Sequence, residues 1–397
     1  MSVFPAIAMF AIVLMWAWIL SKRFGAPSTN GRFASLDGLR GYLAFGVFIY
    51  HGSIWYYFVR SGKWGVPPSH VYTNLGEASV MLFFMITGFL FCSKLLRGRS
   101  ERIDWHKLYV SRFLRLVPVY LLAVALMVLT ICIITSFQLR EPVSTFSKSI
   151  LTWSSFSFTG IPNINRFEKT FIVIAGVTWT LRYEWLFYFT LPLLAGLVGV
   201  VTPRRFMICS FAIVAWMCYQ LRPELIYLVA FVGGITAACL VHFDLIRNLS
   251  RGIAGSILAA VAILAAVLCF PTAYQLQPLA LLSIGFAIIA GGNTLFGALA
   301  WPASRFLGQL TYSIYLLHGI ILFWVFRFAI GFRNAAYYSL FEHWLLISLC
   351  IPLVLTVCYI TFRFIELPAM RSVSKVRTWF RSSATAQVTA VQQTAQS

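Results

Sequence analysis

The sequence predicts an all-α protein, a polytopic transmembrane bundle of about eleven helices. Of its 397 residues, 60% are hydrophobic and only 11% are charged, whereas about 25% charged residues is usual for a soluble domain. The apolar residues are grouped into runs of about 17 to 25, the length that crosses a bilayer as a helix. No long polar block interrupts these runs, so we expect no separate soluble domain.

The positions of the charges explain the net charge of +20 without a nucleic acid as partner. Lysines and arginines gather in alternate connections between the apolar runs, as the positive-inside rule predicts. The expected partner of these segments is therefore the lipid bilayer. The eight cysteines all fall inside apolar runs and none has a CxxC spacing, so we interpret them as small buried hydrophobic residues, with no disulfide framework and no metal site.

Hydrophobicity places the spans at residues 3–20, 41–58, 78–96, 116–135, 179–200, 206–221, 225–242, 253–270, 276–291, 306–326 and 343–362. Basic flanks put the N-terminus outside and the C-terminus in the cytoplasm, so we expect a multi-pass protein of the inner (plasma) membrane. Residues 1–31 contain an N-terminal transmembrane helix that precedes the main domain. Lys22 and Arg23 after this helix indicate that it is retained and is not a cleaved signal peptide. Residues 32–370 form the main membrane domain, and residues 371–397 form a basic and then disordered tail.

The longest outer connection, residues 136–178, is aromatic and weakly charged. Trp153, Phe156, Phe158 and Phe167 occur in it among serines and asparagines. Two interpretations remain open from the sequence. The connection covers a pocket, or its aromatic residues belong to the interfacial belt of the membrane.

Arg40 begins an apolar segment, and His51 lies deep within it. Their spacing is about three helical turns, so both side chains share one face, about 16 Å apart along the axis. Burying an ionisable group in lipid is costly, and such groups are usually kept for function. We therefore predict that His51 is a general base for a hydroxyl and that Arg40 marks the cytoplasmic end of one path to it. The alternatives are a core histidine and an ordinary positive-inside arginine.

Three further segments carry candidate site residues. Arg112 and Arg115 lie three residues apart, on one helix face, and suit the binding of phosphates, although the sequence alone slightly favours an ordinary basic inner loop. Arg182 and Glu184 lie at the outer part of a span, where they pair with each other, or where Glu184 orients a histidine or binds an acceptor sugar. His318 is a second central histidine, and Ser313 and Tyr315 add polar groups near it.

These motifs together resemble the acyltransferase 3 family of membrane-bound O-acyltransferases. The resemblance rests on residues 36–41 with His51, and on residues 83–90, 112–120, 179–181 with Glu184 and Tyr188, 307–308, 312–318 and 363–368. It implies about ten helices, a cytoplasmic acyl-CoA donor, and transfer to a hydroxyl, often of a surface glycan. It also implies that Arg40 and His51 are essential. Two features depart from the family pattern: the helix at 3–20 is extra, and Arg182 replaces a residue that is commonly small or apolar.

We therefore predict an integral-membrane O-acyltransferase that moves an acyl group, with acetyl expected, from acyl-CoA to a carbohydrate or lipid-linked sugar. The expected roles are catalysis by His51, Arg40 and Glu184, donor binding by Arg40, Arg112 and Arg115, and acceptor binding by Glu184, Tyr315 and His318. The rival prediction is a transporter or flippase of a lipid-linked glycan, which also uses intramembrane ionisable residues. A glycan polymerase is disfavoured because the outer loop holds only Arg140 and Arg166 as arginines.

Overall fold

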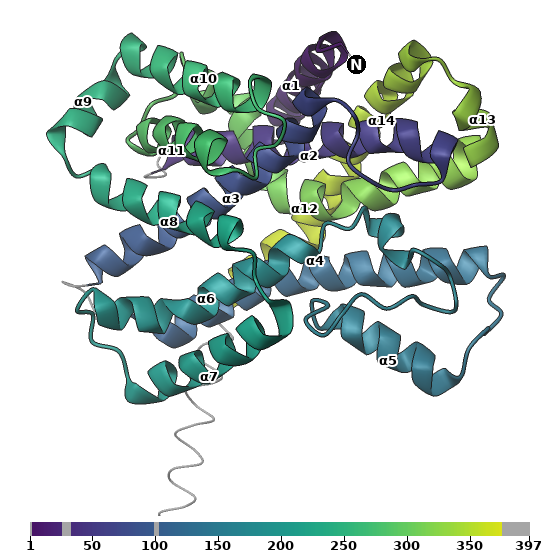
Figure 1. Ribbon diagram of the computed structural model, residues 1–397, viewed down its shortest axis with the longest axis horizontal. Coiled ribbons are helices and arrows are strands. Elements are labelled where there is room, and N and C mark those ends of the chain that lie inside the picture. The colour runs from purple at the N-terminus through teal and green to yellow at the C-terminus, as the bar shows by residue number, and fades with distance from the viewer. Residues whose placement is uncertain (1, 26–32, 99–102, 375–397) are drawn as a thin grey trace, which may run out of the picture.

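The computed structural model describes residues 2–25, 33–98 and 103–374, and these parts of the chain are helical without a β-strand (Figure 1). Each of the eleven predicted ranges falls on a helix. These helices are α1 (Phe4–Phe24), α2 (Ala34–Ser61), α3 (His70–Arg97), α4 (Trp105–Ile134), α6 (Trp179–Leu197), α7 (Arg204–Leu221), α8 (Leu225–Leu240), α10 (Ile253–Leu268), α11 (Leu276–Ala290), α12 (Pro302–Trp324) and α14 (Leu340–Thr361).

Short helical segments connect or extend the long ones. They are α5 (Val143–Ser154), η1 (Thr170–Ile174), α9 (Asp244–Arg251), η2 (Ala298–Ala300), η3 (Val325–Ile330), α13 (Phe332–Tyr337), η4 (Phe362–Glu366) and α15 (Leu367–Arg371). In Figure 1, α2, α3 and α12 run through the middle of the molecule. Helices α8, α10 and α11 lie on one side of them, and α4, α6 and α7 lie below.

The number of membrane spans is smaller than predicted when each helix is judged by length and apolar composition. Within the described residues five helical stretches qualify, namely α1, α3, α4, α12 with η3, and α14 with η4 and α15. Helices α8 and α9 make a sixth candidate, broken by a bend of 96°. Helix α2 does not qualify, although it is 28 residues long, because polar residues such as Arg40 and His51 interrupt its apolar sequence. The all-helical membrane fold is thus confirmed, and the count of about eleven spans is not.

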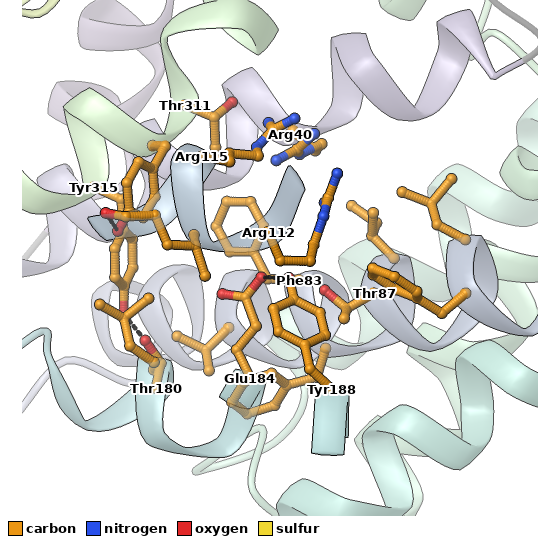
Figure 2. A pocket seen from close by; sticks show the side chains of 18 of the residues that line it. Arg40, Phe83, Thr87, Arg112, Arg115, Thr180, Glu184, Tyr188, Thr311 and Tyr315 are labelled. Atoms are coloured by element: carbon orange, nitrogen blue, oxygen red, sulfur yellow. Dashed lines mark hydrogen bonds between the residues drawn. The ribbon is translucent and has the colours of Figure 1, made fainter. Parts of the chain in front are cut away.

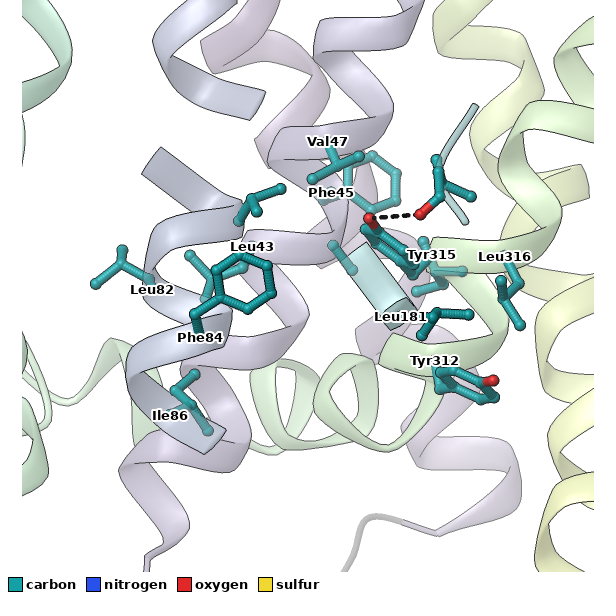
Figure 3. Packing of buried hydrophobic residues seen from close by; sticks show 14 of the residues in the cluster. Leu43, Phe45, Val47, Leu82, Phe84, Ile86, Leu181, Tyr312, Tyr315 and Leu316 are labelled. Atoms are coloured by element: carbon teal, nitrogen blue, oxygen red, sulfur yellow. Dashed lines mark hydrogen bonds between the residues drawn. The ribbon is translucent and has the colours of Figure 1, made fainter. Parts of the chain in front are cut away.

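Helices α2 and α12 pack against each other closely because glycines remove the side chains between them. A Cβ atom on Gly308 of α12 would lie 1.9 Å from the carbonyl oxygen of Asp37 in α2. Small residues allow this backbone approach where lipid provides little hydrophobic force between helices. Apolar side chains of α2, α3, α6 and α12, including Leu43, Leu82 and Leu181, pack together in the core of the bundle (Figure 3).

The outer connection, residues 136–178, is tied to the bundle by buried polar groups. The hydroxyl of Tyr120 in α4 donates to the carbonyl of Trp153, 2.6 Å away, and the Trp153 indole donates to the carbonyl of Pro162 at 2.9 Å. The amide of Asn165 donates to the Thr135 hydroxyl at 2.9 Å. These bonds hold the connection across the ends of α4 and α6, where it covers a cavity described below.

The cysteines are free thiols, but their environment differs from the prediction. Cys92, Cys350 and Cys358 are buried, whereas Cys209, Cys218, Cys239 and Cys269 are exposed on the outside of the bundle. An apolar run in a membrane protein has a lipid-facing side as well as a core side, so a cysteine in such a run need not be buried in the protein.

Candidate active site

Three arginines line a cavity of about 260 Å³ between α2, α3, α4, α6 and α12, which we call the arginine cavity (Figure 2). Its polar wall consists of Asp37 and Arg40 from α2, Thr87 from α3, Arg112 and Arg115 from α4, Thr180, Glu184 and Tyr188 from α6, and Thr311, Tyr312 and Tyr315 from α12. The sequence predicted that Arg40, Arg112 and Arg115 act together, and the fold brings them to one cavity.

The arginine cavity holds three arginines and two carboxylates, those of Asp37 and Glu184, which form no ion pair with one another. Among the described residues the ion pair of Asp244 with Arg247 lies elsewhere, and no carboxylate is within ion-pair distance of the three cavity arginines. Glu184 accepts a hydrogen bond from the Tyr188 hydroxyl, as Figure 2 shows. Guanidinium groups suit phosphate and carboxylate ligands through their planar donor geometry. The cavity is therefore suited to an anionic ligand.

His51 lines a second cavity of about 410 Å³, which we call the histidine cavity. Its wall includes Tyr50, His51, Trp64, Glu77, Trp179, Arg182, Tyr227 and Tyr274. Residues 175–178 and Phe171 of the outer connection also line it, whereas Trp153, Phe156, Phe158 and Phe167 do not. Burial raises the pKa of Tyr274 well above its ordinary value, so its hydroxyl stays protonated and can donate.

The two central histidines, His51 and His318, contact each other. Nε2 of His318 lies 3.0 Å from Nδ1 of His51, and both rings are buried. Nδ1 of His318 is 2.8 Å from the carbonyl oxygen of Ile314, and Nδ1 of His51 is 3.0 Å from that of Val47. A carbonyl oxygen only accepts, so each neutral ring carries its proton on Nδ1.

This arrangement fixes which nitrogen of His51 is basic. Nε2 of His318 has no proton in that tautomer, and the single Nδ1–H of His51 is shared between this nitrogen and the Val47 carbonyl, each 3.0 Å away. The lone pair of His51 is then on Nε2, and His51 is the member of the pair that lines the histidine cavity. A base oriented by a second group is the usual arrangement for activating a hydroxyl. His318 lies behind His51 and lines neither cavity, so it is placed to orient the base and not to contact an acceptor.

Neighbouring elements hold this pair in place. A Cβ atom on Gly319 would lie 2.7 Å from the Cβ of Ala175, so the glycine after His318 lets the end of η1 approach α12. On the other side, Nε2 of His343 in α14 lies 2.8 Å from the carbonyl oxygen of Gly52, the residue after His51. His343 could not be selected from the sequence, because its partner is a backbone atom of another helix.

Tyr315 and Val80 separate the two cavities. Both residues line the arginine cavity and the histidine cavity. The Tyr315 hydroxyl is 2.7 Å from the Thr180 hydroxyl and donates to the carbonyl of Val177 at 3.2 Å. The single path predicted from Arg40 to His51 is therefore two adjoining cavities, and Tyr315 is part of the wall between them.

Arg182 and Glu184 serve different cavities and do not pair. Two residues apart on a helix, they point to nearly opposite faces of α6. Arg182 lines the histidine cavity, and Glu184 lines the arginine cavity. This excludes the interpretation of these two charges as an internal ion pair. It also places Glu184 away from His51, on the side of Arg40, Arg112 and Arg115.

Glu77 is a site residue that the sequence reasoning missed. Its Oε2 accepts from the Thr272 hydroxyl and from the backbone N–H of Ala273, the latter at 2.9 Å. The predicted span began at residue 78, so the carboxylate was assigned to a connection. Helix α3 begins at His70, however, and Glu77 is buried within it. A buried acidic residue beside a long apolar run was the available signal.

Two further predictions concern the ends of the domain. The sequence of residues 363–368 predicts that a Glu366–arginine pair anchors the last helix, but Glu366 is buried and accepts a hydrogen bond from Ser313 at 3.2 Å, while Arg363 is exposed. No ion pair of Glu366 occurs among the described residues. The predicted basic inner loop before Arg112 also contains Arg99 and Arg102. These two residues and the tail from residue 375 lie outside the described residues.

A buried imidazole base beside an anion-binding cavity, inside a bundle of membrane helices, is typical of an integral-membrane enzyme that transfers a group to a hydroxyl. Comparison with protein families identifies the family to which the chain belongs. Residues 33–363 match the model of an acyltransferase domain. The chain belongs to the acyltransferase 3 family.

One curated relative supports this assignment at low identity. The acyltransferase MdmB of Streptomyces mycarofaciens is 27% identical over 195 residues. That alignment covers 48% of this chain and 46% of the relative, so the chain spans about half the length of the curated relative that it matches. Comparison with solved structures gives no match.

Proposed function

We propose that this protein is an integral-membrane O-acyltransferase that transfers an acyl group, acetyl in the simplest case, from acyl-CoA to a hydroxyl of a carbohydrate. Family membership supports acyl transfer. One observation supports the proposed donor and acceptor. Three arginines without an ion-pair partner among the described residues line one cavity, a histidine oriented by His318 lines the next, and Tyr315 lines both. A transporter of lipid-linked glycans is disfavoured by the family match.

The arginine cavity is the proposed donor site. Arg40, Arg112 and Arg115 would bind the phosphates of CoA, because their positive charges have no internal ion-pair partner among the described residues. Arg40 and His51 are eleven residues apart on α2, which is about 16 Å along the helix. A long flexible pantetheine arm spans such a distance, so the thioester would reach the wall between the cavities at Tyr315.

The histidine cavity is the proposed acceptor site. Nε2 of His51 would remove the proton from the acceptor hydroxyl as its oxygen bonds to the carbonyl carbon of the thioester. The carbon–sulfur bond then breaks, and the protonated His51 gives the proton to the leaving thiolate. His318 would keep Nδ1–H of His51 bonded through the cycle. Atoms and charges balance, with an ester and free CoA as the products.

The positions of the lysines and arginines suggest which side of the membrane each cavity faces. Arg40, Lys94, Arg112 and Arg115 lie near the arginine cavity, so the positive-inside rule puts that cavity on the cytoplasmic side. Donor from the cytoplasm and acceptor from the outer side would then meet inside the plasma membrane. This orientation also puts the C-terminus in the cytoplasm.

The direct test uses purified protein in lipid nanodiscs with radiolabelled acetyl-CoA. The acceptor is polysaccharide from cells that lack the gene, so that the acceptor positions are free. We expect label in the polysaccharide and release of one CoA thiol per ester formed. Alkali should remove the label, because it hydrolyses esters. No label with any acyl-CoA of two to eight carbons would contradict the proposed donor.

A further inference from the structure

Arg182 is a cation in the histidine cavity that the proposed reaction does not use. Its Nε is buried and has no hydrogen-bond partner among the described residues. No carboxylate of the described residues lies within ion-pair distance of its guanidinium group. The side chain nevertheless lines the same cavity as His51.

Two carboxylates on α6 and α3 that could supply a counter-charge have other hydrogen-bond partners. Glu184 lies on the opposite face of α6 and accepts from the Tyr188 hydroxyl. Glu77 lines the histidine cavity from α3, but its Oε2 accepts from the Thr272 hydroxyl and from the Ala273 N–H. Those bonds fix Glu77 against the connection between α10 and α11.

An unpaired guanidinium inside a membrane bundle is costly, and a ligand that supplies the opposite charge removes much of this cost. The planar donors of arginine match the two oxygens of a carboxylate especially well. The remaining cavity wall suits a sugar ring. Trp64, Trp179 and Tyr227 offer apolar ring faces with polar edges, and the free oxygen of Glu77 can accept from a hydroxyl.

We infer that the acceptor is an acidic sugar, whose carboxylate binds Arg182 while a hydroxyl of its ring faces His51. This inference rests on the proposed function for the identity of the histidine cavity as the acceptor site. It makes Arg182 the residue that determines acceptor specificity. A neutral sugar has the ring and the hydroxyls but leaves the guanidinium unpaired.

Ligand binding tests this inference without requiring turnover. The probes are p-nitrophenyl β-glucuronide and p-nitrophenyl β-glucoside, which differ at the carboxylate. Affinities are measured by calorimetry for the wild type, Arg182→Gln and Arg182→Lys in nanodiscs. Arg166→Gln is the matched control, because Arg166 is an exposed arginine of the outer connection and lines neither cavity.

We expect the wild type and Arg166→Gln to bind the glucuronide roughly ten- to a hundredfold more tightly than the glucoside. Arg182→Gln should bind both probes alike, and Arg182→Lys should keep part of the preference. Equal or undetectable affinities in the wild type would overturn the inference, as would a preference that survives in Arg182→Gln. Tighter binding of glucose 6-phosphate than of the glucuronide would overturn the assignment of a carboxylate.

The result is separable from the proposed function. Acetyl transfer by a wild type that binds both probes equally would overturn this inference and leave the transfer reaction in place. A glucuronide preference that depends on Arg182, in a protein that never consumes acyl-CoA, would support the inference and contradict the proposed donor.

Discussion

His318 Nε2 lies 3.0 Å from His51 Nδ1, and this contact joins the middle of α12 to the middle of α2. The carbonyl of Ile314 holds the proton of His318 on Nδ1, so His318 accepts and His51 donates. The direction of this bond leaves Nε2 of His51 as the basic nitrogen. Only a basic Nε2 on His51 can remove the proton of an acceptor hydroxyl in the proposed reaction.

His318→Leu should lower kcat for acyl transfer by roughly ten- to a hundredfold, because His51 loses the acceptor that fixes its tautomer and ring orientation. The KM values for donor and acceptor should stay close to wild type, since His318 lines neither cavity. Steady-state kinetics with both substrates varied give the two values separately.

His318→Gln is the matched variant, because its amide oxygen can accept from His51. We expect it to recover a substantial part of kcat. A merely structural role would make the Leu and Gln variants fail together, with lower melting temperatures. An unchanged kcat in His318→Leu would contradict the orienting role.

Removing positive charge from the arginine cavity should weaken donor binding. Arg112→Gln and Arg115→Gln are each expected to raise KM for acetyl-CoA by roughly tenfold, because each loses a charged hydrogen bond to phosphate. The control Arg204→Gln changes an exposed arginine outside the cavity. Equal KM values in all three variants would exclude the arginine cavity as the phosphate site.

Opening the wall between the cavities should uncouple donor cleavage from transfer. Tyr315→Ala removes a ring that lines both cavities, together with its hydroxyl contact of 2.7 Å to Thr180. Water then gains access to the thioester, and acceptor-independent CoA release should increase several-fold. A thiol-reactive dye measures that release. Tyr315→Phe keeps the ring and should show little increase, and an equal increase in both variants would argue against the ring as the barrier.

The close packing of α2 on α12 should be sensitive to one methyl group. Gly308→Ala puts a Cβ 1.9 Å from the Asp37 carbonyl oxygen, so the helices must move apart. We expect a loss of about 1–3 kcal/mol in stability and a lower melting temperature. Gly252→Ala is the control, because its nearest neighbour atom is 3.9 Å away. Equal melting temperatures for both variants would contradict the role of Gly308.

The sequence predicted the helices well because apolar run length is a local property. The sequence also identified His51 and His318, since an ionisable residue within an apolar run can be recognised without the structure. It did not predict that the two rings touch, because that contact depends on how Gly308 and Gly319 let other segments approach α12. The acceptor-binding role expected for His318 changed to an orienting one for this reason.

Other parts of the site depended on element ends and helix faces. Glu77 was missed because the start of α3 was placed eight residues too late, at 78 and not at His70. Arg182 and Glu184 are only two residues apart in the sequence, yet the turn of the helix directs them to separate cavities. Tyr315 divides the one expected path into two cavities. This division follows from the packing of α3, α6 and α12, and contacts between separate helices cannot be inferred from any one segment of the sequence.

The most direct test of the central claim is acetyl transfer by His51→Gln, purified in nanodiscs beside the wild type. The account predicts that kcat falls by about 10²–10⁴-fold, the usual contribution of a general base, while the melting temperature and the affinity for acetyl-CoA remain those of the wild type. Transfer at the wild-type rate by a folded His51→Gln protein would contradict the claim that His51 is the base.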